Sequence, residues 1–197
     1  GTAGATVGHG LSSQLDVIFI KNRTNAEAWQ TYHRPLGATH HLVLNGNDTA
    51  QDNDSRFNDV HPTSSVFTLG NNDTVNKNTS NFVAYCFHSV KGFSKFGSYV
   101  GTSSQVFIYT GFKPKFILIK KSSESASWHL FDTSRTASNG GNQLNKILFP
   151  NLSNAENEDT NHNLDFLSNG FKWRTDSGIR NGSGNQIIYM AFAEQPL

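Results

Sequence analysis

The chain has 197 residues, of which 36% are hydrophobic, and its 16 basic and 15 acidic side chains nearly cancel. This composition provides enough apolar material for one good-sized globular domain or two small ones. A net charge of +1 gives no basic surface that would attract nucleic acid or an anionic membrane. No segment is apolar over the length needed to span a membrane. We therefore expect neither a nucleic-acid partner nor a membrane.

Strand-like runs follow one another along the whole chain, bounded by Gly, Asn, Asp, Ser or Pro. In chain order they lie at 16–21, 28–33, 40–45, 65–69, 81–90, 105–110, 115–120, 127–132, 146–149, 170–175 and 186–193. They predict an all-β fold, and this number of short strands suits a β-sandwich better than a single small sheet.

One stretch of sequence occurs twice in similar form. "DVIFIKNRTNAEAW" ends at Trp29 and "KFILIKKSSESASW" ends at Trp128, 99 residues later. Towards the end of each copy "NFVAYCF" aligns with "QIIYMAF", and the closing residues Phe87 and Phe192 are 105 residues apart. The offset between the copies thus grows from 99 to 105, which indicates that the extra residues lie in loops. We predict two tandem half-repeats of about 95 residues, repeat 1 at 1–90 and repeat 2 at 106–197, joined by 91–105.

The length of the repeat favours two halves of one domain. We expect them to pack with pseudo-twofold symmetry around a single core, as one β-sandwich over residues 1–197; two separate sandwiches are the alternative. The recurring aromatic residues are expected to be structural core residues, and these are Trp29, Trp128, Phe87 and Phe192. "GFSKFGSYV" precedes the second copy without a counterpart before the first. This asymmetry predicts that more protein lies upstream and that the chain is the C-terminal part of a longer one.

The stretch "NGNDTAQDNDSRFND" is the most acidic loop of the first copy. Clustered oxygen ligands suit Ca²⁺, but the Gly and the terminal Glu of a twelve-residue calcium loop are missing. Solvated turns, in which Asn and Asp cap their own backbone, explain the same residues, so no metal is predicted. Asp52, Asn53 and Asp54 remain candidate binding residues.

Trp173 is the fourth candidate binding residue, because it has no matching Trp in the first copy and lies in the alternating run "FKWRT". That pattern favours a place on an outer face or in a ligand groove. Catalytic residues are not predicted: the sequence has no G-x-S-x-G elbow, and its one cysteine, Cys86, lies in an apolar run typical of a buried thiol.

Several motifs together resemble a known family. "TVGHGL", "VIFIKNR", "PTSSVFTLG", "FVAYCF", "GFSKFGSYVG", "FIYTGFKPKFILIK", "LSNGFKWRT" and "AFAEQP" are similar, over essentially the whole chain, to an uncharacterised domain of tail-fibre and other virion proteins of tailed bacteriophages, mostly marine ones. The resemblance implies a jelly-roll or concanavalin-like β-sandwich, located in the extracellular phage particle. It supplies no catalytic residues and no cofactor.

The resemblance also implies a function and partners. We expect a receptor-binding module of a tail fibre that attaches to a host cell-surface glycan or protein, contacts other virion subunits and forms a homo-oligomer, a trimer as phage fibres commonly do. A capsid-decoration or fibre-assembly protein without receptor binding is the alternative, and a polysaccharide depolymerase is the third. An exposed groove with Trp173 or loop carboxylates would favour receptor binding, a large apolar face would favour assembly, and two facing carboxylates in a cleft would favour hydrolysis.

Overall fold

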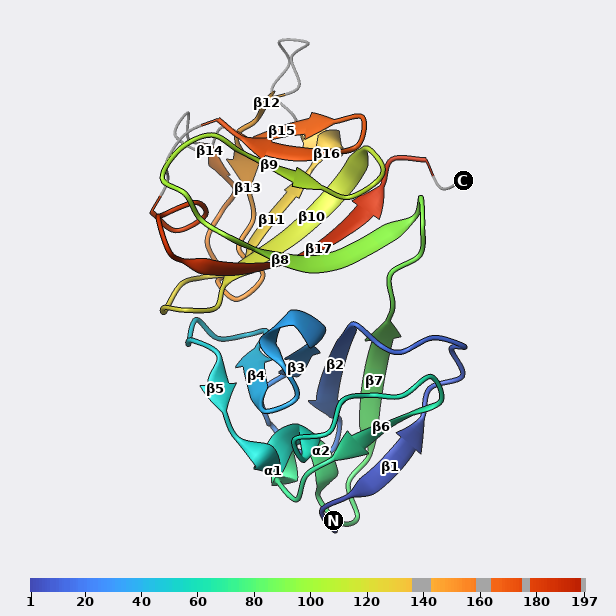
Figure 1. Cartoon of the computed structure of the whole chain (residues 1–197). Coiled ribbons are helices and arrows are strands. Elements are labelled where there is room, and N and C mark those ends of the chain that lie inside the picture. Colours follow the sequence, from blue (N-terminus) through green and yellow to red (C-terminus); the bar gives the residue numbers. More distant parts are fainter. Residues whose placement is uncertain (136–142, 159–163, 175–177, 196–197) are drawn as a thin grey trace. The chain divides into compact units, whose positions relative to one another are not determined.

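The computed structural model describes residues 1–135, 143–158, 164–174 and 178–195 (Figure 1). Its regular structure is almost entirely antiparallel β-strand, so the predicted all-β, sandwich-like fold is confirmed. The chain divides into two compact units, Gly1–His88 and Ser89–Leu197, here called unit 1 and unit 2.

Unit 1 is built from one five-stranded sheet and one two-stranded ribbon. The sheet has the order β5-β4-β3-β2-β7, and β1 pairs with β6 to make the ribbon. The elements are β1 (Ala5–Gly8), β2 (Val17–Asn22), β3 (Gln30–His33), η1 (Arg34–Leu36), β4 (His40–Val43), β5 (Gln51–Asp52), α1 (Asp54–Phe57), β6 (Val66–Leu69), α2 (Asp73–Asn76) and β7 (Phe82–Phe87).

The core of unit 1 lies between the sheet and the ribbon. Alternation along β2 sends Ile18 and Ile20 into this core, where they meet Phe67 and Leu69 of β6. The short helices complete the cover, since α1 contributes Phe57 and α2 contributes Val75 to the same cluster. The ribbon and the helices thus lie over one face of the five-stranded sheet (Figure 1).

Unit 2 contains two four-stranded sheets, in the orders β11-β10-β17-β8 and β12-β15-β16-β9, and a small ribbon of β13 and β14. The elements are β8 (Ser94–Val100), β9 (Val106–Tyr109), β10 (Pro114–Lys121), β11 (His129–Asp132), η2 (Thr133–Arg135), β12 (Gln143–Leu144), β13 (Lys146–Ile147), β14 (Asn157–Glu158), β15 (Leu164–Leu167), β16 (Gly170–Trp173) and β17 (Gln186–Ala193). Thr175, the end of the strand predicted at 170–175, lies outside the described residues.

The two large sheets of unit 2 enclose a core of their own. One sheet contributes Ile117, Ile119, Ile187, Tyr189 and Ala191, and the other contributes Ile108, Leu164, Phe166, Phe171 and Trp173. The described buried residues form one cluster in each unit, and the arrangement of both halves around a single core stays a prediction. The segment 91–105, expected to join the repeats, contains β8, which pairs with β17 along its length.

The strand pairings of the two units correspond in register. Ile20 lies opposite Gln30 between β2 and β3, and Ile119 lies opposite His129 between β10 and β11. These pairs are related by the 99-residue offset of the repeated sequence. The predicted repeat is thus reflected in the pairing, whereas the pseudo-twofold symmetry and the jelly-roll or concanavalin-like topology stay predictions.

The same correspondence extends to the other strand pairs. Val17 lies opposite Phe87 where Phe116 lies opposite Phe192. The ribbon of unit 1 corresponds to β9 and β16, and this match places Leu69 at the position of Trp173.

Candidate functional site

Trp173 does not lie on an outer face, so this prediction is wrong. The side chain is 1% exposed and belongs to the core of unit 2, where its ring meets Phe131 edge-on at 5.7 Å. Its Nε1–H donates a hydrogen bond of 2.8 Å to the Tyr99 hydroxyl. The alternation in "FKWRT" is real, but it directs Phe171 and Trp173 inward.

The three predicted loop residues of unit 1 lie next to one another at the start of α1. Asp52 and Asp54 are exposed, and Asn53 is the N-cap of the helix. The Asn53 Oδ1 accepts hydrogen bonds from the backbone N–H of Ser55 at 3.0 Å and from its hydroxyl at 2.6 Å. Asn53 thus has a capping role, and nothing in this geometry gathers the three side chains around a ligand.

Several carboxylates elsewhere are held by basic partners. Glu156 accepts from Arg135 at 2.7 Å and lies 3.5 Å from the Lys146 ammonium. The hydrogen bond from Arg135 lowers the pKa of Glu156. Across residues 1–135, 143–158, 164–174 and 178–195, no three His, Cys, Asp or Glu side chains gather in a way that could hold a metal ion.

The predicted core aromatics take two kinds of place. Trp128 is 1% exposed, whereas Trp29 is half-buried and stacks on Tyr85 with ring centroids 6.1 Å apart. Phe87 and Phe192 are also half-buried and belong to neither core cluster. They are partly covered aromatics of the sheet faces rather than core residues.

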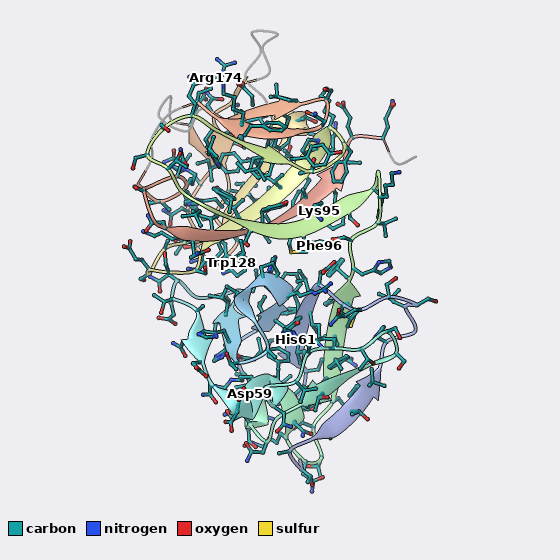
Figure 2. The ribbon with its side chains drawn as sticks, viewed as in Figure 1. Asp59, His61, Lys95, Phe96, Trp128 and Arg174 are labelled. Atoms are coloured by element: carbon teal, nitrogen blue, oxygen red, sulfur yellow. The ribbon has the colours of Figure 1, made fainter. Side chains whose placement is uncertain are left out.

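The feature that distinguishes unit 1 is an open side along β7. In unit 2 the corresponding strand, β17, pairs with β10 on one side and with β8 on the other. In unit 1, β7 pairs with β2 and ends the sheet, because no described strand takes the place of β8. Figure 2 labels Lys95 and Phe96 on β8, the strand that pairs with this edge of β17.

The free edge of β7 offers backbone hydrogen-bonding groups. The Arg23 N–H donates to the Asn81 carbonyl at 2.8 Å, beside the β2–β7 pairing. Hydrogen-bonded pairs alternate along an antiparallel ladder, so the N–H and C=O groups of Phe82, Ala84 and Cys86 point away from β2.

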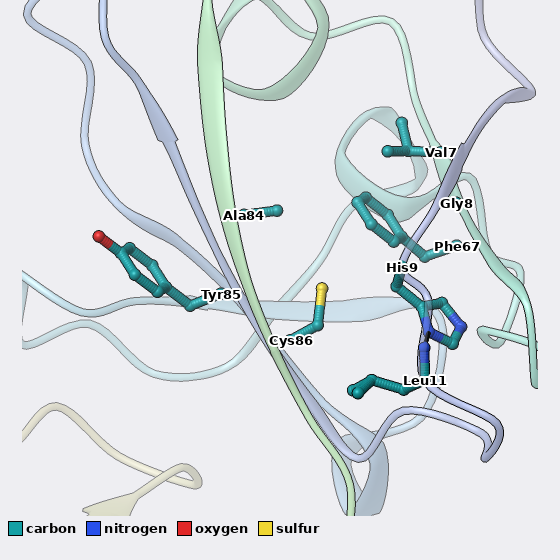
Figure 3. A pocket seen from close by; sticks show the side chains of 8 residues that line it. All are labelled: Val7, Gly8, His9, Leu11, Phe67, Ala84, Tyr85 and Cys86. Carbon is teal, nitrogen blue, oxygen red and sulfur yellow. Dashed lines mark hydrogen bonds between the residues drawn. The ribbon is translucent and has the colours of Figure 1, made fainter.

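Two adjoining cavities lie beside this edge, between β7 and the ribbon of β1 and β6. One has a volume of about 460 Å³ and is shown in Figure 3; the other measures about 310 Å³. Both volumes are typical of ligand-binding pockets. Val7, Phe67 and Ala84 line both cavities, which adjoin along β7 from Phe82 to Cys86 and are together called the cleft.

The lining of the cleft is mostly apolar and contains no carboxylate. Polar side chains at its border are those of His9, Asn76, Lys77 and Ser80. His9 accepts a hydrogen bond from the Leu11 N–H at 3.1 Å through Nδ1, and Lys77 pairs with Asp73 at 3.2 Å. Figure 3 shows the Cys86 sulfur directed toward the cleft. Burial raises the pKa of the Cys86 thiol, which therefore stays protonated at neutral pH.

The cleft exists because unit 1 has small side chains where unit 2 has large ones. Ala84 takes the place of Tyr189, and Leu69 that of Trp173, both of which fill the core of unit 2. A further aromatic of that unit, Tyr99, comes from β8 and contacts Phe171 and Tyr189. Sequence reasoning missed the site, although two signals were present: the missing first-copy counterpart of "GFSKFGSYV", and Ala84 aligned with Tyr189.

Comparison with known proteins places the chain in a family. The sequence profile of a domain of unknown function, DUF7483, matches residues 1–196. The chain belongs to this DUF7483 family. No curated protein and no solved structure matches it. Among the described residues, no helix of this DUF7483 domain is long and apolar enough to cross a membrane.

Proposed function

We propose that this DUF7483 domain is a non-catalytic binding module of a tailed-phage virion protein, and that the open side of unit 1 binds a neighbouring virion subunit. The phage assignment is supported by the sequence motifs that resemble tail-fibre and other virion proteins. The choice of assembly over receptor binding is carried by one observation, the apolar cleft beside the unpaired edge of β7.

The chemistry of the cleft suits a protein partner better than a glycan or a hydrolysed polysaccharide. A glycan needs many polar groups to satisfy its hydroxyls, whereas Val7, Phe67 and Ala84 offer apolar surface. Glycoside hydrolysis needs two facing carboxylates, and the cleft lining contains none. A polypeptide would use both the apolar surface and the free backbone groups of β7.

The test is made in phage particles that encode the chain. Ala84→Tyr places the side chain of unit 2 in the cleft. Tyr85→Phe on the same strand is the matched control, because it removes only a hydroxyl group from a ring that points away from Val7 and Phe67 (Figure 3). We expect Ala84→Tyr to lower the amount of the protein in purified particles, measured by quantitative mass spectrometry and electron microscopy, and Tyr85→Phe to leave it unchanged. Normal incorporation of a folded Ala84→Tyr protein would overturn the assembly role.

Host attachment is the second candidate, and one observation favours it. Trp29 and Tyr85 stack at an interplanar angle of 29°, and Tyr85 is 50% exposed. Exposed aromatic faces with a polar tip are suited to recognition, so a host-surface glycan fits this pair. Saturable binding of the purified chain to host cells or to a glycan array, lost in Tyr85→Ala, would establish attachment; the expected trimer is tested in the same sample by light scattering.

A further inference from the structure

We propose that the free edge of β7 accepts, as an antiparallel strand, an extended segment of a partner protein with a large apolar side chain opposite Ala84. This inference rests on the proposed function, because it names the partner chemistry of the same cleft. It is argued from unit 2, where the equivalent edge is occupied.

The occupied edge shows how such a strand is held. β8 runs antiparallel to β17, with Tyr99 opposite Ile187 and Gly97 opposite Tyr189. Tyr99 enters the core of unit 2, while position 97 has no room for a side chain, because a Cβ there would lie 2.6 Å from the Tyr189 hydroxyl. The large residue on β17 thus requires a glycine on its partner strand.

Unit 1 reverses this relation. Ala84 takes the place of Tyr189, and both cavities border Ala84. A strand added to β7 therefore needs a large side chain at the position of Gly97 to fill the cleft. Packing of interiors to near-crystalline density makes such a filled arrangement more stable than an open one.

The sequence of β7 is that of a strand that is paired rather than protected. Edge strands avoid association by carrying charges or proline, as β5 does with Asp52 and β8 with Lys95. β7 reads "FVAYCF" and has neither. Strand addition derives affinity from main-chain hydrogen bonds and specificity from pockets for alternate side chains, and the edge and the cleft supply both.

The probe is a peptide copied from residues 92–102, which contain β8. One version keeps the natural sequence and the other carries Gly97→Leu, and binding of each labelled peptide to the whole chain is measured by fluorescence anisotropy. We expect the Gly97→Leu peptide to bind about 10-fold tighter or more, in line with the burial of a leucine side chain.

The location of binding is read from two independent signals. Amide hydrogen exchange should slow at Phe82, Ala84 and Cys86, whose N–H groups face the edge, and should change little at Tyr85, whose N–H faces β2. Cys86 is the single cysteine of the chain, so its reaction with a thiol reagent should also slow when the peptide is bound.

Ala84→Tyr is the matched protein variant, because it gives β7 the residue of β17. It should lose the preference for the Gly97→Leu peptide, while Tyr85→Phe keeps it. Absence of binding by both peptides, or binding without protection of the three amides, would overturn the proposal. Protection that rises with the concentration of the protein alone would assign the edge to a second copy and would also overturn it. These outcomes are independent of the virion experiment, so either proposal can fail alone.

Discussion

Units 1 and 2 have corresponding strand pairings, but they differ in whether the sheet edge is paired and the core is filled. In unit 2 a strand covers the edge of β17, and Tyr189, Trp173 and Tyr99 fill the space between the sheets. In unit 1 the edge of β7 is free, and Ala84 and Leu69 leave a cleft. Strand register and core filling are therefore separate properties, because the same strand pairing occurs with a filled core in unit 2 and with an open cleft in unit 1.

The largest expected effect tests the filled side of the comparison. Trp173→Ala should lower the free energy of unfolding by about 3–5 kcal/mol, because it opens a cavity in a closed core and removes the donor to Tyr99. Leu69→Ala is the matched change in unit 1 and should cost about 2 kcal/mol, since Leu69 already borders an open cavity. Urea denaturation followed by fluorescence measures both, and equal losses would contradict the difference between the units.

The second prediction tests the pairing of Gly97 with Tyr189. Gly97→Ala should destabilise by about 1–3 kcal/mol, because the added methyl group overlaps a buried ring that packs against Phe171. In a Tyr189→Ala background, which imitates unit 1, the same change should add little further cost. An unchanged penalty in that background would place the strain elsewhere and weaken the reasoning applied to the partner of β7.

Part of this architecture was predictable from local pattern. The alternating and apolar runs predicted the strands. The repeat is matched in the pairing, since Ile20 and Ile119 have corresponding partners, but no register was predicted from it. The buried state of Trp173 was not predictable from alternation. A strand with one solvent-exposed face shows the same two-residue period whichever of its faces is exposed. Only the match with Leu69, a core residue, assigns the face.

The cleft was harder to predict, because it depends on a strand and on large side chains that unit 2 has and the described part of unit 1 lacks. The lack of a first-copy counterpart of β8 is visible in the sequence, but it says nothing about whether another element covers the edge. Ala84 reads as an ordinary strand residue until it is set against Tyr189. The membership of the buried cluster in each unit likewise depends on long-range packing, which the length of the repeat does not determine.

The third prediction concerns a polar residue found in unit 1 where unit 2 is apolar. His41 is 2% exposed and takes the place of Ile147 in the corresponding strand. Burial, and then the Arg56 guanidinium, lower the pKa of His41 to about 4 from an ordinary 6.5. The folded state therefore holds a neutral His41, and the unfolded state takes up a proton first as the pH falls.

His41 should make unit 1 pH-sensitive. Its contribution to stability is present above pH 6.5 and is lost as the pH falls from about 6.5 to about 4. His41→Ile, which installs the residue of unit 2, should flatten the dependence of the unfolding midpoint on pH in this window. Comparison of the two slopes is the measurement, and a variant with the wild-type slope would show that other groups produce the pH dependence.

The smallest expected effect on stability is that of Ala84→Tyr, the change that would make the cleft of unit 1 resemble the core of unit 2. Ala84 is exposed at a free edge, so the new ring replaces water in an open cavity and displaces no packed side chain. The free energy of unfolding should change by about 0.5 kcal/mol or less. The same ring should slow the reaction of Cys86 with a thiol reagent, because both side chains lie in one cleft.

A small change in stability together with slower labelling would separate the stability of unit 1 from the filling of its cleft. The cleft could then be filled at little cost to the fold, which supports a role for its openness in binding. A loss of several kcal/mol would instead mean that Ala84 is required for the packing of unit 1, and the comparison with Tyr189 would no longer support a binding site.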